Sequence, residues 1–319
     1  MSKTATKLVD VPSNVVDSIG NTPIVSLNKI VPKGSARILA KLELANPTSS
    51  MKDRMAKSVI EAASKDGRLH AGGTVVEYTA GTTGISLAMV CAAKGYKFHA
   101  VFSDAFSEEK RLTMKAFGAE VTDVKSEDKR ITEKLIKAMI ERSREISQRP
   151  SHWWADQLNN HDALTGYYPL GEEIWKQSGG KVDAFVHSVG TAHSIHGVTR
   201  ILRKYNPRVQ VSAVEPAESA VLSGKPTGSH KIEGIGIGFI PPLWEASQVN
   251  EIIPVSTEEA WAMARRLGKE EGLFVGASSG ANMVASLQVA KRLGPDATVA
   301  TLMVDSGLRY LSTDLFKNL

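Results

Sequence analysis

A lysine in an unusual position is the first feature of this sequence that could do chemistry. Lys52 lies in the segment Asn46–Arg54, directly before a helical pattern, which places it in the first turn of a helix. Because a helix N-terminus carries positive partial charge, a protonated lysine is unfavourable there. An amine with a lowered pKa, or one bound as an imine, suits this position better. The alternative is an ordinary capping box, with Ser50 as the cap and Asp53 three residues later.

Three further loops are rich in glycine and hydroxyl side chains and stand before helical patterns. They are Thr79–Gly84, Gly190–Ser194 and Gly276–Gly280. Small residues at a helix start expose backbone N–H groups that can bind an anion, such as a carboxylate at the first loop or a phosphate at the second. The second loop lacks the Walker lysine pattern, which argues against a nucleoside triphosphatase. Plain tight turns and surface caps are the alternatives.

A glycine-rich stretch farther along, Glu233–Gly238, could suggest a dinucleotide site. Its glycines follow a G-x-G-x-G pattern, and no helical pattern follows Phe239 and Ile240. The Rossmann fingerprint needs G-x-G-x-x-G between a strand and a helix. We therefore reject a Rossmann cofactor here.

Composition excludes several classes of protein. The 319 residues suggest two domains, and 42% apolar with 23% charged residues is typical of a globular chain. The net charge of +5 is spread along the chain without a lysine and arginine run, so we expect no nucleic-acid partner. No apolar stretch approaches the roughly 18–20 residues of a membrane helix, so we expect no membrane partner.

The single cysteine limits the redox and metal chemistry. Cys91 can form no intrachain disulfide and no cysteine-based zinc site, and its apolar surroundings indicate a small buried hydrophobe. The histidines lack carboxylate or cysteine partners at ligand spacing, so we expect no metal site. Residues Met1–Pro12 show no targeting pattern, and a reducing cytoplasmic location fits best.

Strand and helix patterns alternate along the chain. The predicted strands are Arg37–Glu43, Thr74–Tyr78, Lys97–Phe102, Glu120–Val124, Ala184–Val189, Gln210–Val214 and Thr298–Val304. The predicted helices between them include Met55–Asp66, Ile85–Lys94, Glu108–Phe117, Ile131–Gln148 and Ile195–Lys204. This alternation indicates an α/β fold with parallel sheet and helices on both faces. The unusual loops fall where such folds place their active sites, at the carboxyl ends of strands.

Taken together and in this order, the loops resemble those of the cysteine synthase and cystathionine β-synthase family. These are pyridoxal-phosphate enzymes of the tryptophan-synthase-β type, fold type II. The resemblance runs from Gly20–Pro23 to Arg309–Thr313, and its most specific part is Asn46 and Pro47 followed by Ser50–Arg54. We expect neither a haem-binding N-terminal extension nor a C-terminal regulatory module, and the resemblance is greatest to the short cysteine synthases.

The resemblance implies a role for each loop. Lys52 would carry pyridoxal 5'-phosphate as an imine and, once released, act as general base at the substrate α-carbon. Ser278 would face the pyridine nitrogen, which disfavours long-lived carbanions and favours loss of a β-substituent. The other implied cofactor-binding residues are Thr82, Gly190, Thr191, Ala192, His193 and Ser194. The implied substrate-binding residues are Thr79, Ala80, Gly81, Thr83, Gln157 and Gly234.

The sequence departs from the family pattern at two loops. Ala80 and Thr82 stand where the family usually has serine and asparagine, which removes a hydroxyl donor to the substrate carboxylate. Ala192 and His193 replace two glycines of the phosphate loop. If either glycine position requires positive φ, the backbone must differ. His193 would either place a titrating cation beside the phosphate or point into solvent.

The implied architecture is two three-layer αβα domains. Residues 46–158 would form a smaller, mobile substrate domain, and residues 1–45 plus 159–319 a larger cofactor domain, in a homodimer. The implied reaction is β-replacement or β-elimination on a serine or cysteine derivative through an aminoacrylate, with O-acetylserine and sulfide giving cysteine as the default. The partners are then a small amino acid and a small nucleophile. A cysteine desulfhydrase, a synthase of a non-standard amino acid such as diaminopropionate, and a non-catalytic binding protein are the alternatives.

Overall fold

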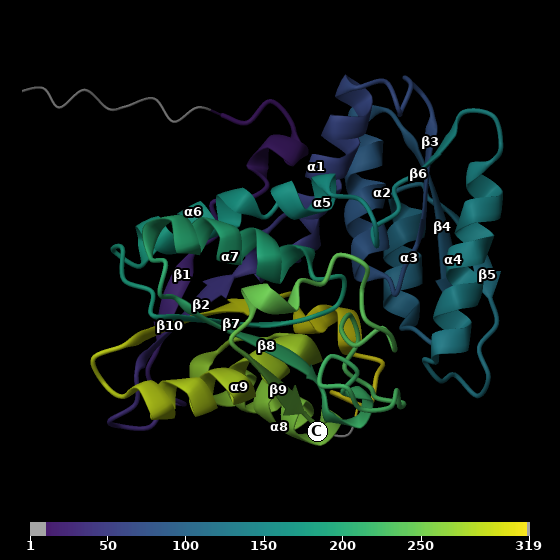
Figure 1. Ribbon diagram of the computed structural model, residues 1–319. Helices are drawn as coiled ribbons and strands as arrows, with labels where there is room; N and C mark the ends of the chain where they lie inside the picture. Colours follow the sequence, from purple (N-terminus) through teal and green to yellow (C-terminus); the bar gives the residue numbers. More distant parts are fainter. Residues whose placement is uncertain (1–10, 318–319) are drawn as a thin grey trace, which may run out of the picture.

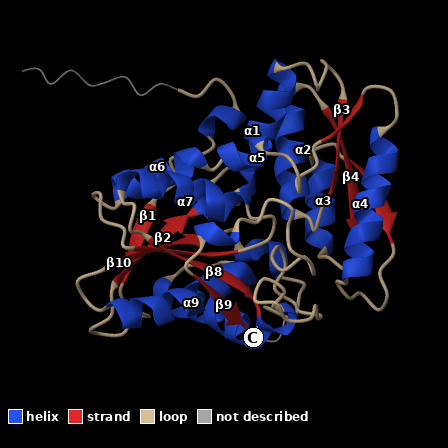
Figure 2. Ribbon diagram, in the orientation of Figure 1, coloured by secondary structure: helices blue, strands red, loops and turns tan. Residues whose placement is uncertain are grey.

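Two β-sheets organise the molecule, and each carries helices on both faces (Figures 1 and 2). The computed structural model describes residues 11–317. The expectation about targeting in Met1–Pro12 therefore lies almost wholly outside the described residues. We call the half built on the six-stranded sheet the large lobe and the half built on the four-stranded sheet the small lobe.

The large lobe contains strands from both ends of the sequence. Its sheet has the order β1-β2-β10-β7-β8-β9, in which β1 pairs with β2 antiparallel and the other pairs are parallel. Figure 1 shows α6 and α7 on one face and α8 and α9 on the other. The central strands are buried along their whole length because helices cover both faces. The strands are β1 (Ile24–Leu27), β2 (Arg37–Leu42), β7 (Ala184–Ser188), β8 (Gln210–Pro216), β9 (Glu251–Val255) and β10 (Thr298–Met303). The helices are α5 (Asp162–Thr165), α6 (Tyr168–Gln177), α7 (His193–Tyr205), α8 (Thr257–Arg266) and α9 (Ala277–Leu293).

The small lobe has a fully parallel sheet with the order β5-β4-β3-β6. Helices α1, α2 and α3 lie on the side of this sheet toward the large lobe, and α4 covers the opposite face (Figure 1). The strands are β3 (Thr74–Tyr78), β4 (Lys97–Ser103), β5 (Glu120–Val124) and β6 (His152–Trp154). The helices are α1 (Lys52–Lys65), α2 (Thr82–Lys94), α3 (Glu108–Ala116) and α4 (Glu133–Ser147). The short helical turns of the molecule are η1 (Val15–Ser18), η2 (Glu43–Ala45), η3 (Ala217–Ser219), η4 (Ala246–Gln248), η5 (Leu267–Glu271) and η6 (Gly307–Tyr310).

The predicted α/β fold class is confirmed, with three differences in detail. Strand β1, which the sequence did not predict, pairs antiparallel with β2, whereas the alternation predicts parallel pairing. Strands β6 and β9 are absent from the sequence prediction, because β6 has only three residues and β9 contains Pro254. Proline is tolerated there since β9 is an edge strand. All strands of the small lobe lie between residues 74 and 154, while the predicted domain boundaries themselves stay a prediction.

The apolar interior consists of two clusters. One fills the small lobe and continues under α5 and α7 onto one face of the large sheet, and the other lies between that sheet and α8 and α9. Cys91 belongs to the first cluster and is 1% exposed. Burial raises the pKa of its thiol well above the ordinary value. It is therefore the small buried hydrophobe that the sequence predicts.

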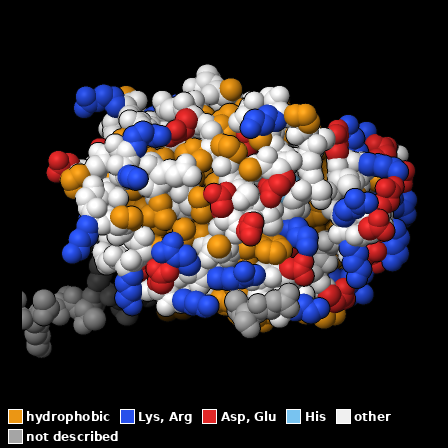
Figure 3. Space-filling view, turned by 90° about the horizontal axis from the view of Figure 1, so that it is seen from below, with side chains coloured by type: hydrophobic (Ala, Val, Ile, Leu, Met, Phe, Trp, Pro, Cys, Tyr) orange, Lys and Arg blue, Asp and Glu red, His pale blue; other side chains and the backbone are white. Residues whose placement is uncertain are grey.

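The surface mixes charges of both signs. On the face drawn in Figure 3, basic and acidic side chains are interspersed, with hydrophobic groups between them. None of the helices within residues 11–317 is long and apolar enough to cross a membrane. Among the described residues, no three histidine, cysteine or acidic side chains gather in a way that could hold a metal ion.

Candidate active site

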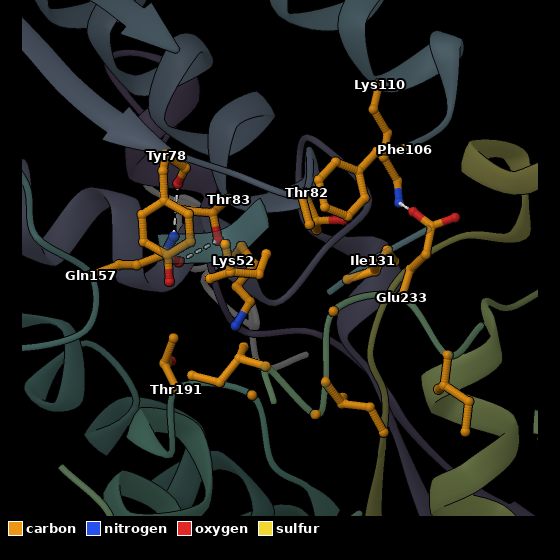
Figure 4. A pocket seen from close by; sticks show the side chains of 18 of the residues that line it. Lys52, Tyr78, Thr82, Thr83, Phe106, Lys110, Ile131, Gln157, Thr191 and Glu233 are labelled. Atoms are coloured by element: carbon orange, nitrogen blue, oxygen red, sulfur yellow. Dashed lines mark hydrogen bonds and ion pairs between the residues drawn. The ribbon is translucent and has the colours of Figure 1, made fainter. Parts of the chain in front are cut away.

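A pocket between the lobes collects residues from most of the predicted loops (Figure 4). It encloses about 720 Å³ of space, its opening to solvent included. The predicted site residues that line it are Lys52, Ala80, Thr82, Thr83, Gln157, Gly190, Thr191 and Gly234. The other predicted site residues are not among those that line it, namely Thr79, Gly81, Ala192, His193, Ser194 and Ser278. Isoleucine and aromatic side chains form most of the remaining wall, at Tyr78, Phe106, Ile131, Ile136, Ile232, Ile235 and Ile237.

Lys52 is the first residue of α1 and points into this pocket. Loss of hydration in the pocket lowers the pKa of its amine from 10.5 to about 8, and the Asp305 carboxylate opposes part of this shift. About a tenth of the amine is therefore unprotonated at pH 7, far more than for an ordinary lysine. The sequence predicts a depressed amine from the helix N-terminus, and the structure adds burial as the main cause.

The capping-box alternative for this segment is wrong. The Asp53 carboxylate accepts hydrogen bonds from the Thr48 N–H, at 2.7 Å, and from the Thr48 hydroxyl, at 2.5 Å, so it does not reach back to Ser50. Ser50 Oγ accepts a bond of 3.2 Å from the Lys52 N–H. Asp53 thus folds the loop before the helix and holds the start of α1 in place.

The segment Val304–Ser306, after β10, joins the lysine loop to the start of α9. Met51 N–H donates to Val304 O at 3.0 Å, and Ser306 N–H donates to the Ser49 carbonyl at 3.1 Å. On its other side, Val304 N–H donates to Ser279 Oγ at 2.8 Å. Main-chain bonds therefore fix the lysine relative to the α9 loop.

The small-lobe loop is held by the Thr79 hydroxyl. Thr79 Oγ1 accepts the N–H groups of Gly81 and Gly84 at 2.8 and 2.9 Å. This leaves Thr82 and Thr83 at the start of α2, where the first N–H groups lack an intrahelical acceptor. These two residues line the pocket, so their N–H groups are suited to bind a carboxylate.

Gln157 faces the same loop from the end of β6. Its side-chain oxygen accepts a bond of 3.1 Å from the Thr83 hydroxyl, and its amide nitrogen donates to Tyr78 O at 2.8 Å (Figure 4). The carboxyl group of Glu77 accepts the Gln157 N–H at 2.9 Å. Burial raises the pKa of Glu77 to about 8, so this support is a protonated carboxyl group at neutral pH.

In the large-lobe loop Gly190–Ser194, alanine and histidine stand at positions 192 and 193, where the family usually has glycine. Ala192 adopts φ 70° and ψ −10°, a left-handed conformation that costs an L-residue about 1–2 kcal/mol. The chain therefore keeps positive φ at this position without the glycine. His193 is 2% exposed, so the alternative that it points into solvent is wrong. Burial lowers the pKa of its ring to about 3. A titrating cation beside the phosphate stays a prediction.

The hydroxyl of Ser194, at the start of α7, has a defined donor direction. Asn282 Oδ1 accepts the Ser188 N–H at 2.7 Å, so the Asn282 amide nitrogen, 3.3 Å from His187 Nδ1, is the donor to that ring. The proton of His187 is then on Nε2, 2.8 Å from Ser194 Oγ. Since Ser194 Oγ accepts this bond, its own O–H remains available for an anion.

Ser278 lies one residue inside α9 and is 3% exposed. Its hydroxyl has no side-chain hydrogen bond within residues 11–317. At Gly190 the backbone lies close to another segment, because an added Cβ would lie 2.6 Å from Gly234 O. A side chain is therefore excluded at this point, and the Gly190 loop packs directly on the backbone at Gly234.

Sequence reasoning missed three charged groups of the site. Asp305 Oδ2 accepts hydrogen bonds from Thr82 Oγ1 at 3.4 Å and from the Tyr310 hydroxyl at 2.8 Å. Its position just beyond β10 is the signal that could have found it. Lys110 and Glu233 line the pocket as an ion pair of 2.5 Å, but 123 positions separate them and no sequence pattern connects them.

The residues present fit pyridoxal phosphate. Such a cofactor needs an amine, a site for its phosphate and a partner for its ring nitrogen. The structure supplies the buried Lys52 amine, the free N–H groups of α7 with the Ser194 hydroxyl, and the unengaged Ser278 hydroxyl. His193 Nε2 is an additional buried polar atom without a partner among the described residues. Fold and site together define a pyridoxal-phosphate enzyme of the tryptophan-synthase-β type.

The sequence model of a family described as "Pyridoxal-phosphate dependent enzyme" matches residues 15–305. The chain belongs to this family, and its cofactor is pyridoxal phosphate. A cysteine synthase from Staphylococcus aureus is 40% identical over 310 residues, covering 95% of this chain and 96% of that protein.

Solved structures give the same result. A cysteine synthase from Entamoeba histolytica superposes with a TM-score of 0.90 at 37% identity, covering 100% of this chain and 95% of the other. A hydrogen sulfide-producing enzyme from Fusobacterium nucleatum superposes with a TM-score of 0.89 at 35% identity, covering 94% and 100%. The predicted resemblance to cysteine synthases is confirmed, and the chain is a cysteine-synthase-like enzyme of β-replacement and elimination chemistry.

Proposed function

We propose that this enzyme exchanges the acetoxy group of O-acetylserine for sulfide and releases cysteine. The observation that carries the proposal is the Lys52 amine, which shares one pocket with the free N–H groups of Thr82 and Thr83. An amino acid bound by its carboxylate at α2 has its α-carbon within reach of a base in this pocket. The likeness to cysteine synthases supports the choice of substrate.

Different residues of the chain bind the substrate and transfer its proton. When bound, pyridoxal phosphate supplies an electron sink for the substrate α-carbon. Lys52 takes the α-proton, and its lowered pKa keeps the amine able to accept it near neutral pH. Thr82, Thr83 and Gln157 hold the substrate carboxylate. The acetate leaves from the β-carbon, and the sulfide sulfur forms the new bond there.

The phosphate and ring of the cofactor belong to the large lobe in this proposal. Gly190, Thr191 and the first N–H groups of α7 bind the phosphate together with the Ser194 hydroxyl, while Ser278 faces the ring nitrogen. Apolar walls around the substrate exclude water from the β-carbon. We further propose that residues 46–158 move as the substrate domain, and that the enzyme works as a cytoplasmic homodimer.

The test is a product assay with cofactor-loaded enzyme. With O-acetylserine and sulfide we expect stoichiometric cysteine and acetate. Lys52→Ala should lose turnover by about 10²–10⁴-fold, the usual contribution of a general base, and should lose the absorbance of cofactor bound to the lysine. Acetate without cysteine, or no product from O-acetylserine, would contradict the proposal.

Sulfide release from cysteine is a second candidate. The likeness to a hydrogen sulfide-producing enzyme favours it. Cysteine alone should then yield sulfide and pyruvate. Turnover only with an amine nucleophile would instead indicate a synthase of a non-standard amino acid, and cofactor binding without any turnover would indicate a non-catalytic relative.

A further inference from the structure

The start of α3 in the small lobe is fastened to the large lobe by three neighbouring side chains. The Ser107 hydroxyl donates to Arg309 O at 3.0 Å. The Glu109 carboxylate accepts the N–H and hydroxyl of Ser312 at 3.0 and 2.6 Å. Lys110 forms the ion pair with Glu233. We call Ser107, Glu109 and Lys110 the cross-lobe clasp.

Lys110 is the most buried part of the clasp. Its side chain is 1% exposed and that of Glu233 13% exposed, so both charges are largely removed from water. The Lys110 ammonium also lies 4.3 Å from the centre of the Tyr310 ring. Removing one charge would leave the other buried without its partner, which is much more costly than removing a surface pair.

The aliphatic part of Lys110 packs on the loop that holds Thr82 and Thr83. Gly81 has φ 113°, and a Cβ added there would lie 2.7 Å from Lys110 Cβ and 2.9 Å from its Cγ. The Lys110 methylene groups thus lie flat against the Gly81 backbone. A displacement of Lys110 would remove the support of Gly81, and with it the fixed direction of the next two N–H groups.

The ion pair also marks the passage between the pocket and solvent. Phe106, Ile131, His230 and Glu233 line both the inner pocket and a larger outer groove of about 1630 Å³ between the lobes. Figure 4 shows Lys110 and Glu233 reaching toward each other beside Phe106 and Ile131. The pair therefore joins the lobes beside the place where the inner pocket and the outer groove meet.

We propose that Lys110 is a positioning residue for the amino-acid substrate, anchored by Glu233 from the opposite lobe. It holds Gly81 so that the Thr82 and Thr83 N–H groups face the pocket at a fixed distance from Lys52. The proposal rests on the proposed function, since it assigns the carboxylate of the substrate to these groups. In this proposal Lys110 acts through Gly81 and not by binding the substrate itself.

The test compares Lys110→Met with Arg111→Met. Arg111 is the next residue on α3, and its 2.6 Å ion pair with Asp123 stays within the small lobe. We expect Lys110→Met to raise KM for O-acetylserine about 10- to 100-fold while kcat stays close to that of the wild type. Glu233→Gln should act in the same direction, Lys110→Arg should keep most of the affinity, and Arg111→Met should match the wild type.

Cofactor content and the unfolding transition are measured on each variant, so that misfolding is recognised. An unchanged KM in Lys110→Met, or an equal loss in Arg111→Met, overturns the proposal. So does a loss confined to cofactor content, since that indicates a purely structural role. Amino-acid binding is also followed through the cofactor absorbance without turnover. Weaker binding in Lys110→Met by an enzyme inactive toward O-acetylserine would support the positioning role and reject the proposed reaction.

Discussion

The loops at the starts of α2 and α7 use the same local geometry for different purposes. Each follows a parallel strand and ends in a helix whose first N–H groups lack intrahelical acceptors. At α2 the Thr79 hydroxyl and the Lys110 side chain both support the loop, and Thr82 and Thr83 line the pocket. At α7 the helix start is buried, with a left-handed alanine and a histidine behind it.

This difference indicates that the α2 loop binds a ligand that exchanges, whereas the α7 loop binds a ligand that stays. A support from a side chain of another element, as Lys110 of α3 gives to the α2 loop, can shift when the lobes move. A loop packed directly against the backbone of another segment, as Gly190 is against Gly234, has less freedom to adjust. The first arrangement suits a substrate carboxylate that leaves in every cycle, and the second suits a resident phosphate. Four measurements test this contrast between the two loops.

The largest expected effect concerns Lys52, which lies between the two loops. In the cofactor-free protein its pKa is lowered from 10.5 to about 8, so below pH 8 the folded state bears the full cost of burying the ammonium. Between pH 8 and 10.5 the unfolded chain still binds the proton that the folded state has lost, and this cost disappears. Lys52→Met should therefore raise the unfolding free energy at pH 7 by up to about 3 kcal/mol, and by almost nothing above pH 10.5. Urea titrations of both proteins at the two pH values measure this, and an equal gain at both would refute it.

At the α7 loop, Gly190→Ala should weaken cofactor binding about 10- to 100-fold, because the new methyl group meets a main-chain oxygen that cannot move aside. Equilibrium dialysis of the cofactor gives the constant. Gly268→Ala is the matched control, since its new methyl group would have only Leu273 O nearby, at 3.9 Å. Full cofactor affinity in Gly190→Ala would show that this loop can adjust after all.

At the α2 loop, Thr79→Val should leave two buried N–H groups without their acceptor and destabilise the protein by about 1–3 kcal/mol. We expect a higher KM for the amino acid with unchanged cofactor content, which is the reverse of the Gly190→Ala pattern. Thr79→Ser keeps the hydroxyl and should behave like the wild type. Loss of cofactor in Thr79→Val would remove the distinction between the two loops.

The smallest effect is expected from exchanging alanine and glycine between the loops. Ala192→Gly should stabilise the protein by about 0.5–1 kcal/mol, because relief of left-handed strain exceeds the entropy cost of glycine. Gly81→Ala should destabilise it, since the methyl group would collide with Lys110. Thermal unfolding of both variants reports the sign. A destabilised Ala192→Gly would mean that the buried methyl contributes more than the strain removes.

Local sequence patterns were sufficient to find the loops, because strand ends and small residues are encoded by neighbours in the chain. Lys52 and Gly190 were predicted in this way, whereas Gln157 came only from the family resemblance, and the pocket brings all three together. What the sequence could not show depends on contacts between segments that lie far apart in the chain. The pairing of Lys110 with Glu233 and the burial of His193 both require residues from distant segments. The short strands β6 and β9 were missed because three residues, or a strand containing proline, give no periodicity to detect.

The place of β10 in the sheet has a consequence for how the protein is made. It is the final strand along the described chain, yet it lies between β2 and β7, and the Val304–Ser306 segment after it holds the lysine loop. During synthesis, the pair β1-β2 and the strands β7-β8-β9 cannot join into one sheet until residues 298–303 have been made. The contacts that close the site are thus among those with the largest separation in sequence, which slows folding. A nascent chain that stops short of β10 should leave the ribosome without a place for its cofactor.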